Sequence, residues 1–264
     1  VYSDGSSEEI LGRVLWKWVK RDEIVLATKV FGDEDPNWRG LSRRIIMRQI
    51  DNSLKRLQTD YVDLYQIHRW DPVTPIEEMM EALNDVVRAG KARYIGASSM
   101  YAWQFAKAQQ VAKENGWARF TSMQNQVNLI YREEEREMIP LCLDQGVGLI
   151  PWSPIARGKL ARPVGISTAR AETDNVLENM YSNTIDADNA VISNVEALAK
   201  EIGRPMVQVA LAWIRQKEGV AAPIIGYTRS EQFEQMLGGL DLVLDQEMIN
   251  RLEAPYIPHV PVGF

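Results

Sequence analysis

The sequence has very little of two residue types that often carry chemistry. Its 264 residues include one cysteine, Cys142, and two histidines, His68 and His259. A single cysteine cannot form an intrachain disulfide, and it fits a reducing compartment such as the cytoplasm. Two histidines far apart in the chain, with one cysteine, do not match the ligand spacing of a zinc site. We therefore expect a cytoplasmic protein without a metal centre, in which Cys142 is an inert core thiol.

Long apolar runs and clustered positive charge are also lacking. No apolar run approaches the ~20 residues of a membrane-spanning helix. The net charge is -6, and the basic residues are scattered along the chain rather than grouped. A surface for nucleic acid or for an anionic membrane is therefore not expected.

Short β-branched runs recur along the chain, and the segments between them carry apolar residues at helical spacing. The first four intervals between these runs are about 25 to 40 residues long, which is typical of strand-helix units in a parallel sheet. The runs are nearly all apolar, as strands covered on both faces must be. The predicted strands are EIVLATKV (23–30), YVDLYQIH (61–68), ARYIGASS (92–99), FTSMQNQV (120–127), VGLIPWS (147–153) and AAPIIGYT (221–228).

This pattern predicts an α/β protein and favours a (β/α)8 TIM barrel over an open sheet. No G-x-G-x-x-G motif follows any predicted strand, so the usual signature of a dinucleotide-binding open sheet is missing. Six units are visible where a barrel needs eight, and the chain starts without Met. We expect one barrel domain over residues 1–264, incomplete at the N-terminus, with its first two strands missing from this sequence. The polar segment 158–183 is longer than an ordinary connection, which indicates a lid or a binding loop.

Polar or aromatic residues close the apolar runs. In a (β/α)8 barrel, catalytic side chains stand at the C-terminal ends of the strands, on one rim. One such ending is unremarkable, whereas six endings on one rim predict a site. The residues at these ends are Lys29, His68, Ser98 with Ser99, Gln124, Trp152 with Ser153, and Thr228 with Arg229.

Six motifs that occur in order resemble those of the aldo-keto reductases, which are NAD(P)H-dependent carbonyl reductases on a (β/α)8 barrel. The motifs are VYSDGSSEEILG, VLATKV, YVDLYQIHRWD, GKARYIGASSM, WSPIARGKL and PIIGYTRSEQ. Within that superfamily, the segments SMQNQVNLIYREEEREMIPLC and IHRWD are similar to the aryl-alcohol dehydrogenase-like and general bacterial and fungal branch. The resemblance implies an enzyme that reduces small aldehydes and ketones to alcohols.

The resemblance also implies the catalytic residues. The family uses Asp, Tyr, Lys and His, of which Tyr2, Lys29 and His68 match here, while the aspartate is expected upstream of Val1. A phenol has a pKa near ~10, which a neighbouring ammonium such as that of Lys29 lowers by roughly 1–3 units. Tyr2 is thus the expected general acid, and His68 is expected to hydrogen-bond the carbonyl oxygen. His259, in the C-terminal tail, is expected to have a surface or packing role.

By the same resemblance, NADP is the expected cofactor, with NAD as the alternative. Trp152 would stack on the nicotinamide, and Ser98, Ser99 and Gln124 would bind its carboxamide, with Gln126 as the alternative to Gln124. Thr228 and Arg229 are placed to take a 2′-phosphate, because a guanidinium binds phosphate in a bidentate way. The remaining expected contacts are Ser153, Pro154, Ile155, Arg157, Gly158, Lys159, Gly226, Gln232 and Gln235.

The substrate opening is predicted to include Arg69 and Trp70, with Trp38 and Tyr256 as further candidates. Two other readings stay open. The first is an NADP-binding regulatory subunit, related to the potassium-channel beta subunits, with little turnover. The second is a Schiff-base lyase or aldolase with Lys29 as nucleophile, which would need no nicotinamide. The sequence does not indicate an oligomeric state.

Overall fold

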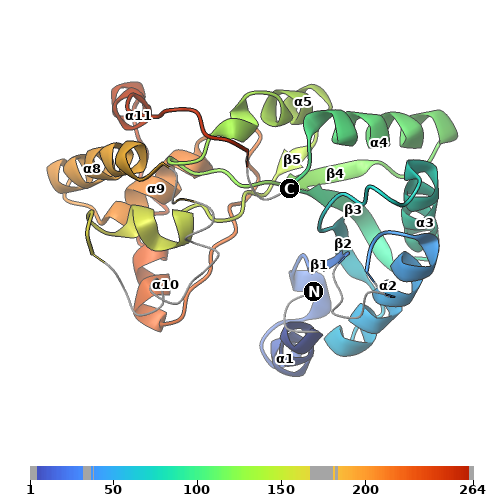
Figure 1. Ribbon diagram of the computed structural model, residues 1–264. Helices are drawn as coiled ribbons and strands as arrows, with labels where there is room; N and C mark the ends of the chain where they lie inside the picture. The colour runs from blue at the N-terminus through green and yellow to red at the C-terminus, as the bar shows by residue number, and fades with distance from the viewer. Residues whose placement is uncertain (1–4, 32–36, 38, 167–180, 182–183, 262–264) are drawn as a thin grey trace. The chain divides into compact units, whose positions relative to one another are not determined.

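The computed structural model describes residues 5–31, 37, 39–166, 181 and 184–261 (Figure 1). The chain divides into two compact units, residues 1–123 and 124–263. The described strands form a sheet in the order β1-β2-β3-β4-β5, which is also their order in the sequence. The strand bounds are β1 Ala27–Val30, β2 Val62–Ile67, β3 Ala92–Ser98, β4 Phe120–Gln124 and β5 Gly148–Leu149.

The first three strands pair in parallel, as predicted. Lys29 of β1 is the Cα partner of Gln66 of β2, and Gln66 is in turn the partner of Gly96 of β3. Paired residues of a parallel sheet have their side chains on the same face, so this register places the strand ends side by side. An α/β fold with a parallel sheet is therefore confirmed. The described strands show no barrel closure.

The sixth predicted strand, 221–228, is not formed. A single parallel bridge joins Leu149 to Val220, and Ile224 N donates to Pro151 O at 2.8 Å. Pro151 and Pro223 have no amide hydrogen, so they interrupt the ladder between these two segments. The same interruption limits β5 to two residues, where the sequence predicted a strand over 147–153.

In the first unit, helices line one side of the strands (Figure 1). Neighbouring helices α2, α3 and α4 contact each other in sequence order, and α1 contacts α2. The apolar positions of α2, among them Ile46, Ile50 and Leu57, recur at helical spacing and are buried, which anchors the helix to the core. The bounds of these helices are α1 Ser6–Val14, α2 Arg43–Leu57, α3 Ile76–Arg88 and α4 Ala102–Asn115, with short 3-10 turns η2 Leu15–Lys17 and η3 Arg21–Glu23.

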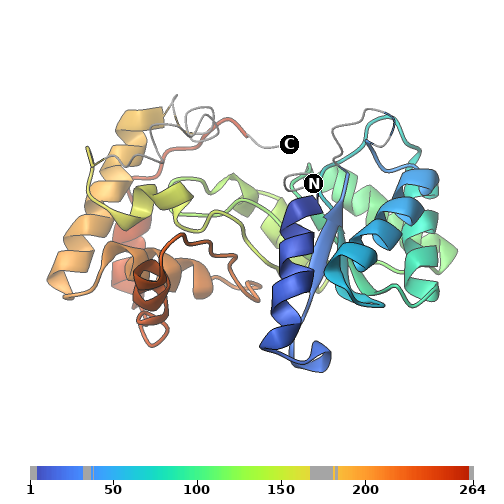
Figure 2. The same ribbon diagram turned by 90° about the horizontal axis from the view of Figure 1, so that it is seen from below.

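The second unit is mainly helical (Figure 2). Its helix α9 is buried along nearly its whole length and contacts α8, α10 and the turn η6. A helix without a polar stripe is stable only where neighbours cover it on all sides, so α9 is the centre of this unit. The bounds are η5 Glu133–Glu135, α5 Met138–Asp144, η6 Ala156–Ala161, α8 Ile185–Glu201, α9 Met206–Arg215, α10 Ser230–Leu237 and α11 Gln246–Glu253.

Most of the predicted long loop, 158–183, lies outside the described residues. Its described beginning forms the end of η6. Among the helices that the structure describes, none has the length and apolar character needed to cross a membrane.

Candidate active site

The two described members of the predicted catalytic set lie at the same end of adjacent strands. Lys29 is in β1, and His68 directly follows β2, where its backbone N donates to Val30 O at 2.8 Å. His68 is two residues beyond Gln66, the register partner of Lys29, so both side chains belong to one face of the sheet. The third predicted residue, Tyr2, lies outside the described residues.

His68 is held in its neutral form. Burial, together with the nearby cations Arg69 and Lys29, lowers its pKa from the usual 6.5 to about 4. A neutral imidazole keeps one N–H donor and one acceptor nitrogen at physiological pH. His68 can therefore donate a hydrogen bond to a carbonyl oxygen without bringing a second positive charge beside Lys29.

Ser98 and Ser99 follow the same edge of the sheet. Ser98 is the last residue of β3, two positions beyond Gly96, and both serines are buried. The first unit thus brings together four of the predicted residues, Lys29, His68, Ser98 and Ser99, at the carboxyl ends of β1, β2 and β3. Catalytic groups of parallel α/β proteins gather at this edge because the strands end there together.

The segment that follows His68 is fixed by Asp71, a residue that the motif analysis did not single out. Its buried carboxylate accepts hydrogen bonds from Leu41 N at 2.8 Å, Val73 N at 2.9 Å and Thr74 Oγ1 at 2.6 Å. Although burial opposes it, these donors lower the pKa of Asp71 below its usual value. Gly40 makes the close approach possible, because a Cβ there would lie 2.7 Å from Asp71 Oδ2.

The predicted substrate residues Arg69 and Trp70 are carried by this fixed segment. Arg69 Nη1 donates to His68 O at 2.8 Å. The ring of Trp70 meets that of Trp103 edge to face, with centroids 6.3 Å apart, and Trp103 is largely exposed. Trp103 was not predicted, because its position on the second residue of α4 resembles that of any surface tryptophan. Trp38 lies outside the described residues.

In the second unit, the segment 153–158 has an unusual backbone. Ser153, Ala156 and Arg157 have φ angles of 54°, 48° and 53°, in the left-handed region that costs non-glycine residues of order 1 kcal/mol each. The amides of Ala156, Arg157 and Gly158 donate to Ser153 O, Ser153 Oγ and Ile155 O, all within the segment. An anion at this segment would therefore be met by the side chains of Arg157 and Lys159 rather than by these amides.

The other predicted cofactor segment of this unit, 226–235, begins close to the first one. Ile224 N donates to Pro151 O, so the segments 152–159 and 226–235 begin next to two backbone stretches that are hydrogen-bonded to each other. Gly226, Thr228 and Arg229 are exposed and immediately precede α10, whose N-terminus favours anions. Gln232 Oε1 accepts from Thr228 N at 3.0 Å, and Gln235 lies one turn further along α10. Gln124, at the end of β4, and Gln126 are both buried.

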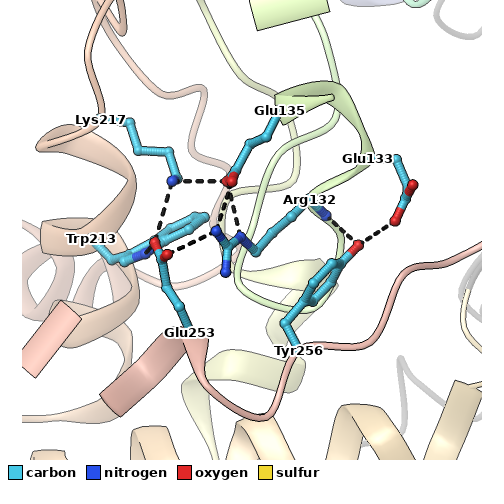
Figure 3. A network of polar contacts seen from close by, with 7 residues as sticks. All are labelled: Arg132, Glu133, Glu135, Trp213, Lys217, Glu253 and Tyr256. Carbon is cyan, nitrogen blue, oxygen red and sulfur yellow. Dashed lines mark hydrogen bonds and ion pairs between the residues drawn. The ribbon is translucent and has the colours of Figure 1, made fainter. Parts of the chain in front are cut away.

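Tyr256 has a structural role in a network of charged groups (Figure 3). Its hydroxyl accepts from Arg132 N at 2.9 Å and donates to Glu133 Oε1 at 2.7 Å. Arg132 also pairs with Glu135 and Glu253, both at 2.7 Å. Lys217 joins the same two carboxylates, and Trp213 Nε1 donates to Glu253 Oε1. The Tyr256 hydroxyl is thus occupied by protein partners.

His259 is bound on both sides of its ring. Nε2 lies 2.9 Å from Asp188 Oδ1, and Nδ1 lies 2.6 Å from Ile257 O, while the ring stacks on Tyr256. The side chains of His259 and Asp188 are 5% and 1% exposed. The hydrogen bond to Asp188 raises the pKa of His259. The predicted packing role of His259 therefore takes the form of a buried hydrogen bond to Asp188 of α8.

Cys142 has no feature of a reactive thiol. It is buried in α5, and burial raises its pKa to about 12. A thiolate is therefore not populated at neutral pH.

Comparison with known proteins identifies the family to which this arrangement belongs. A model of the aldo/keto reductase family matches residues 1–257. The chain belongs to the aldo/keto reductase family. It is therefore an oxidoreductase of a family that acts on small molecules, with a parallel α/β fold.

Its aldo/keto reductase relatives include several fungal proteins. Versiconal hemiacetal acetate reductase of Aspergillus parasiticus is 47% identical over 98% of this chain and 81% of its own length. A protein of Schizosaccharomyces pombe whose name includes aryl-alcohol dehydrogenase is 43% identical over 99% of this chain and 80% of its own. Aldo-keto reductase AMT2 of Alternaria alternata is 41% identical over 100% and 78%.

Proposed function

We propose that this protein is an NADPH-dependent reductase that converts aldehydes or ketones to alcohols, and that residues 1–264 belong to one (β/α)8 domain. The observation that carries the proposal is that Lys29 and His68, whose lowered pKa favours the neutral form, lie on one face at the ends of adjacent strands. A cation and a neutral imidazole donor suit a reaction in which negative charge grows on a carbonyl oxygen. Family membership and relatives named as reductases support the same reaction.

In the proposed mechanism, a bound nicotinamide would supply the hydride that reduces the carbonyl carbon. Tyr2 donates a proton to the carbonyl oxygen, and Lys29 lowers the pKa of that phenol by its positive charge. His68 donates a hydrogen bond to the same oxygen, which orients the carbonyl and stabilises the developing charge. Arg69 and Trp70, on the segment fixed by Asp71, contact the rest of the substrate.

The second unit supports a dinucleotide as the cofactor. Gln126 Oε1 is buried and has no hydrogen-bond partner among the described residues, so a polar ligand group could satisfy it. Gln124 and Trp152 fit the nicotinamide, and Arg157 and Lys159 fit the pyrophosphate. Thr228 and Arg229, ahead of α10, fit a 2′-phosphate, which favours NADP over NAD. The other members of the proposed set are Ser98, Ser99, Ser153, Pro154, Ile155, Gly158, Gly226, Gln232 and Gln235.

The proposal is tested by titrating NADPH and NADH against intrinsic fluorescence and then following the absorbance at 340 nm with 4-nitrobenzaldehyde. We expect NADPH to bind more tightly than NADH and turnover to be lost in Tyr2→Phe while NADPH binding remains. Tight NADPH binding without turnover on a broad carbonyl panel would favour a regulatory subunit instead. Absence of binding to either nucleotide would reject the cofactor assignment.

A further inference from the structure

We propose that Tyr181 is a positioning residue that fixes the segment Ser153–Lys159 in the conformation required to bind the cofactor. The inference rests on the proposed function, which assigns this segment to the dinucleotide. Tyr181 was not among the predicted residues and is not expected to touch the cofactor itself. It is 1% exposed and lies just before α8.

The hydroxyl of Tyr181 is shared by three side chains. Gln126 Nε2 donates to it at 2.9 Å, and Asn128 Nδ2 donates to it at 3.2 Å. The side chain of Ser153 also acts on this hydroxyl and counters part of the rise in its pKa that burial causes. A phenol oxygen has two acceptor positions and one proton. The two amides therefore fill both acceptor positions of the Tyr181 oxygen.

The same side chain also contacts the other end of the segment. Lys159 Nζ lies 5.7 Å from the centroid of the Tyr181 ring, within the range of a cation–π contact. Asn128 Nδ2 adds a bond to Ser153 O at 3.0 Å. Tyr181 therefore joins Ser153 and Lys159 to the buried stretch 126–128 that follows β4.

A segment of this kind needs an external support. Ser153, Ala156 and Arg157 all have positive φ, which residues with a Cβ rarely adopt unless the surroundings enforce it. Within the segment, Ser153 Oγ accepts from Arg157 N at 3.2 Å and so links the first left-handed residue to the last. Asn128, which is bonded to the hydroxyl of Tyr181, donates to the carbonyl of this same Ser153. Loss of that hydroxyl should loosen the whole segment and misplace Arg157 and Lys159.

The experiment compares wild type with Tyr181→Phe, which keeps the ring and removes the hydroxyl. Hydrogen exchange of residues 153–160, measured without nucleotide, is expected to be faster in Tyr181→Phe. The dissociation constant for NADPH is expected to rise about tenfold, the equivalent of one or two buried hydrogen bonds. The fragment 2′-AMP, which lacks the pyrophosphate, depends on the segment 226–235 and should bind within about twofold of wild type. Thr184→Val is the matched control, because it removes only the hydroxyl that donates to Asp188 at the start of α8.

The outcomes separate this inference from the proposed function. Unchanged exchange of residues 153–160 in Tyr181→Phe would overturn the inference, as would an equal loss of affinity for NADPH and 2′-AMP. Failure of the wild type to bind NADPH would overturn the proposed function, while the exchange data would still decide whether Tyr181 holds the segment. If Tyr181→Phe does not fold, Asn128→Ala removes the amide that joins the Tyr181 hydroxyl to Ser153 O and is expected to accelerate exchange in the same way.

Discussion

At the end of β2, His68 lies beside Arg69 and Lys29, and its pKa falls to about 4. In the C-terminal tail, His259 lies against the buried carboxylate of Asp188, and its pKa is raised. Both side chains are removed from water to a large extent, so burial alone does not separate them. Burial is the largest cause of the lowered pKa of His68, and the neighbouring cations add to it, whereas for His259 the hydrogen bond to Asp188 outweighs burial.

The hydrogen-bond geometry of His259 leads to the same conclusion without reference to its pKa. Its two ring nitrogens face Asp188 Oδ1 and Ile257 O, which are both acceptors. Only the imidazolium can donate from both nitrogens at once. The two acceptors beside His259 favour its imidazolium form, which binds the tail to α8, whereas burial and the nearby cations favour the neutral form of His68.

The largest effect expected from substituting one of the two histidines is on catalysis. His68→Ala should lower kcat/KM for aldehyde reduction by roughly 10²–10⁴-fold, because the carbonyl oxygen loses a positioned donor. The NADPH dissociation constant should remain close to that of the wild type. His259→Asn is the matched variant at the other histidine and should keep kcat within about threefold. Similar losses of kcat in the two variants would show that the two sites do not differ as described.

The next effect is on stability. Asp188→Asn removes the charge that His259 faces, and the free energy of unfolding should fall by about 2 kcal/mol at pH 6, as for a hydrogen bond to a charged group. The folded pKa of His259 is raised above the unfolded value of about 6.5. The stabilisation is thus complete below that unfolded value and is lost as the pH rises through the folded pKa.

Urea unfolding of wild type and Asp188→Asn at several pH values between 5.5 and 9 measures this difference directly. The two curves should approach each other as the pH rises. A difference in unfolding free energy that stays constant over this range would mean that His259 is not charged in the native protein.

A smaller effect is expected at Tyr256, whose ring stacks on His259 and whose hydroxyl belongs to the network of Figure 3. Tyr256→Phe keeps the stack and removes the bonds to Glu133 and Arg132 N, so it should cost about 1 kcal/mol of unfolding free energy. The cost should not depend on pH between 6 and 8, unlike that of Asp188→Asn. A pH dependence like that of Asp188→Asn would indicate that the network, rather than Asp188, sets the charge of His259.

How much of these regions the sequence predicts depends on how far apart in the chain the interacting residues lie. Periodicity and β-branched runs located β1 to β4, because strands covered on both faces leave a local apolar pattern. Lys29 and His68, the described residues of the proposed catalytic set, were singled out because each closes such a run. The run 221–228 has the same composition but forms no strand. Pro151 in the neighbouring segment and Pro223 in the run itself have no amide hydrogen, so the hydrogen bonds between the two segments are interrupted.

The contacts that could not be predicted join residues far apart in the chain. Asp71 bonds Leu41, Tyr181 bonds Gln126 and Asn128, and His259 bonds Asp188. In the sequence, each of these residues is an ordinary polar or aromatic side chain with no periodic signal. Their roles depend on the fold having already brought distant segments together, so they become visible only in the structure.

The smallest expected effects are changes in the pKa values of the two histidines. Measuring these pKa values is also the most direct way to compare the two sites. Proton NMR titration should place His68 near 4 and His259 above the usual 6.5. Arg69→Met and Lys29→Met should each raise the pKa of His68, with the larger rise in Arg69→Met because Arg69 contributes more than Lys29. Neither should restore 6.5, because burial is the largest cause of the shift. Both variants should leave His259 unchanged, and Asp188→Asn should lower only the pKa of His259. A His68 that titrates near 6.5 in the wild type would remove the neutral donor from the proposed mechanism.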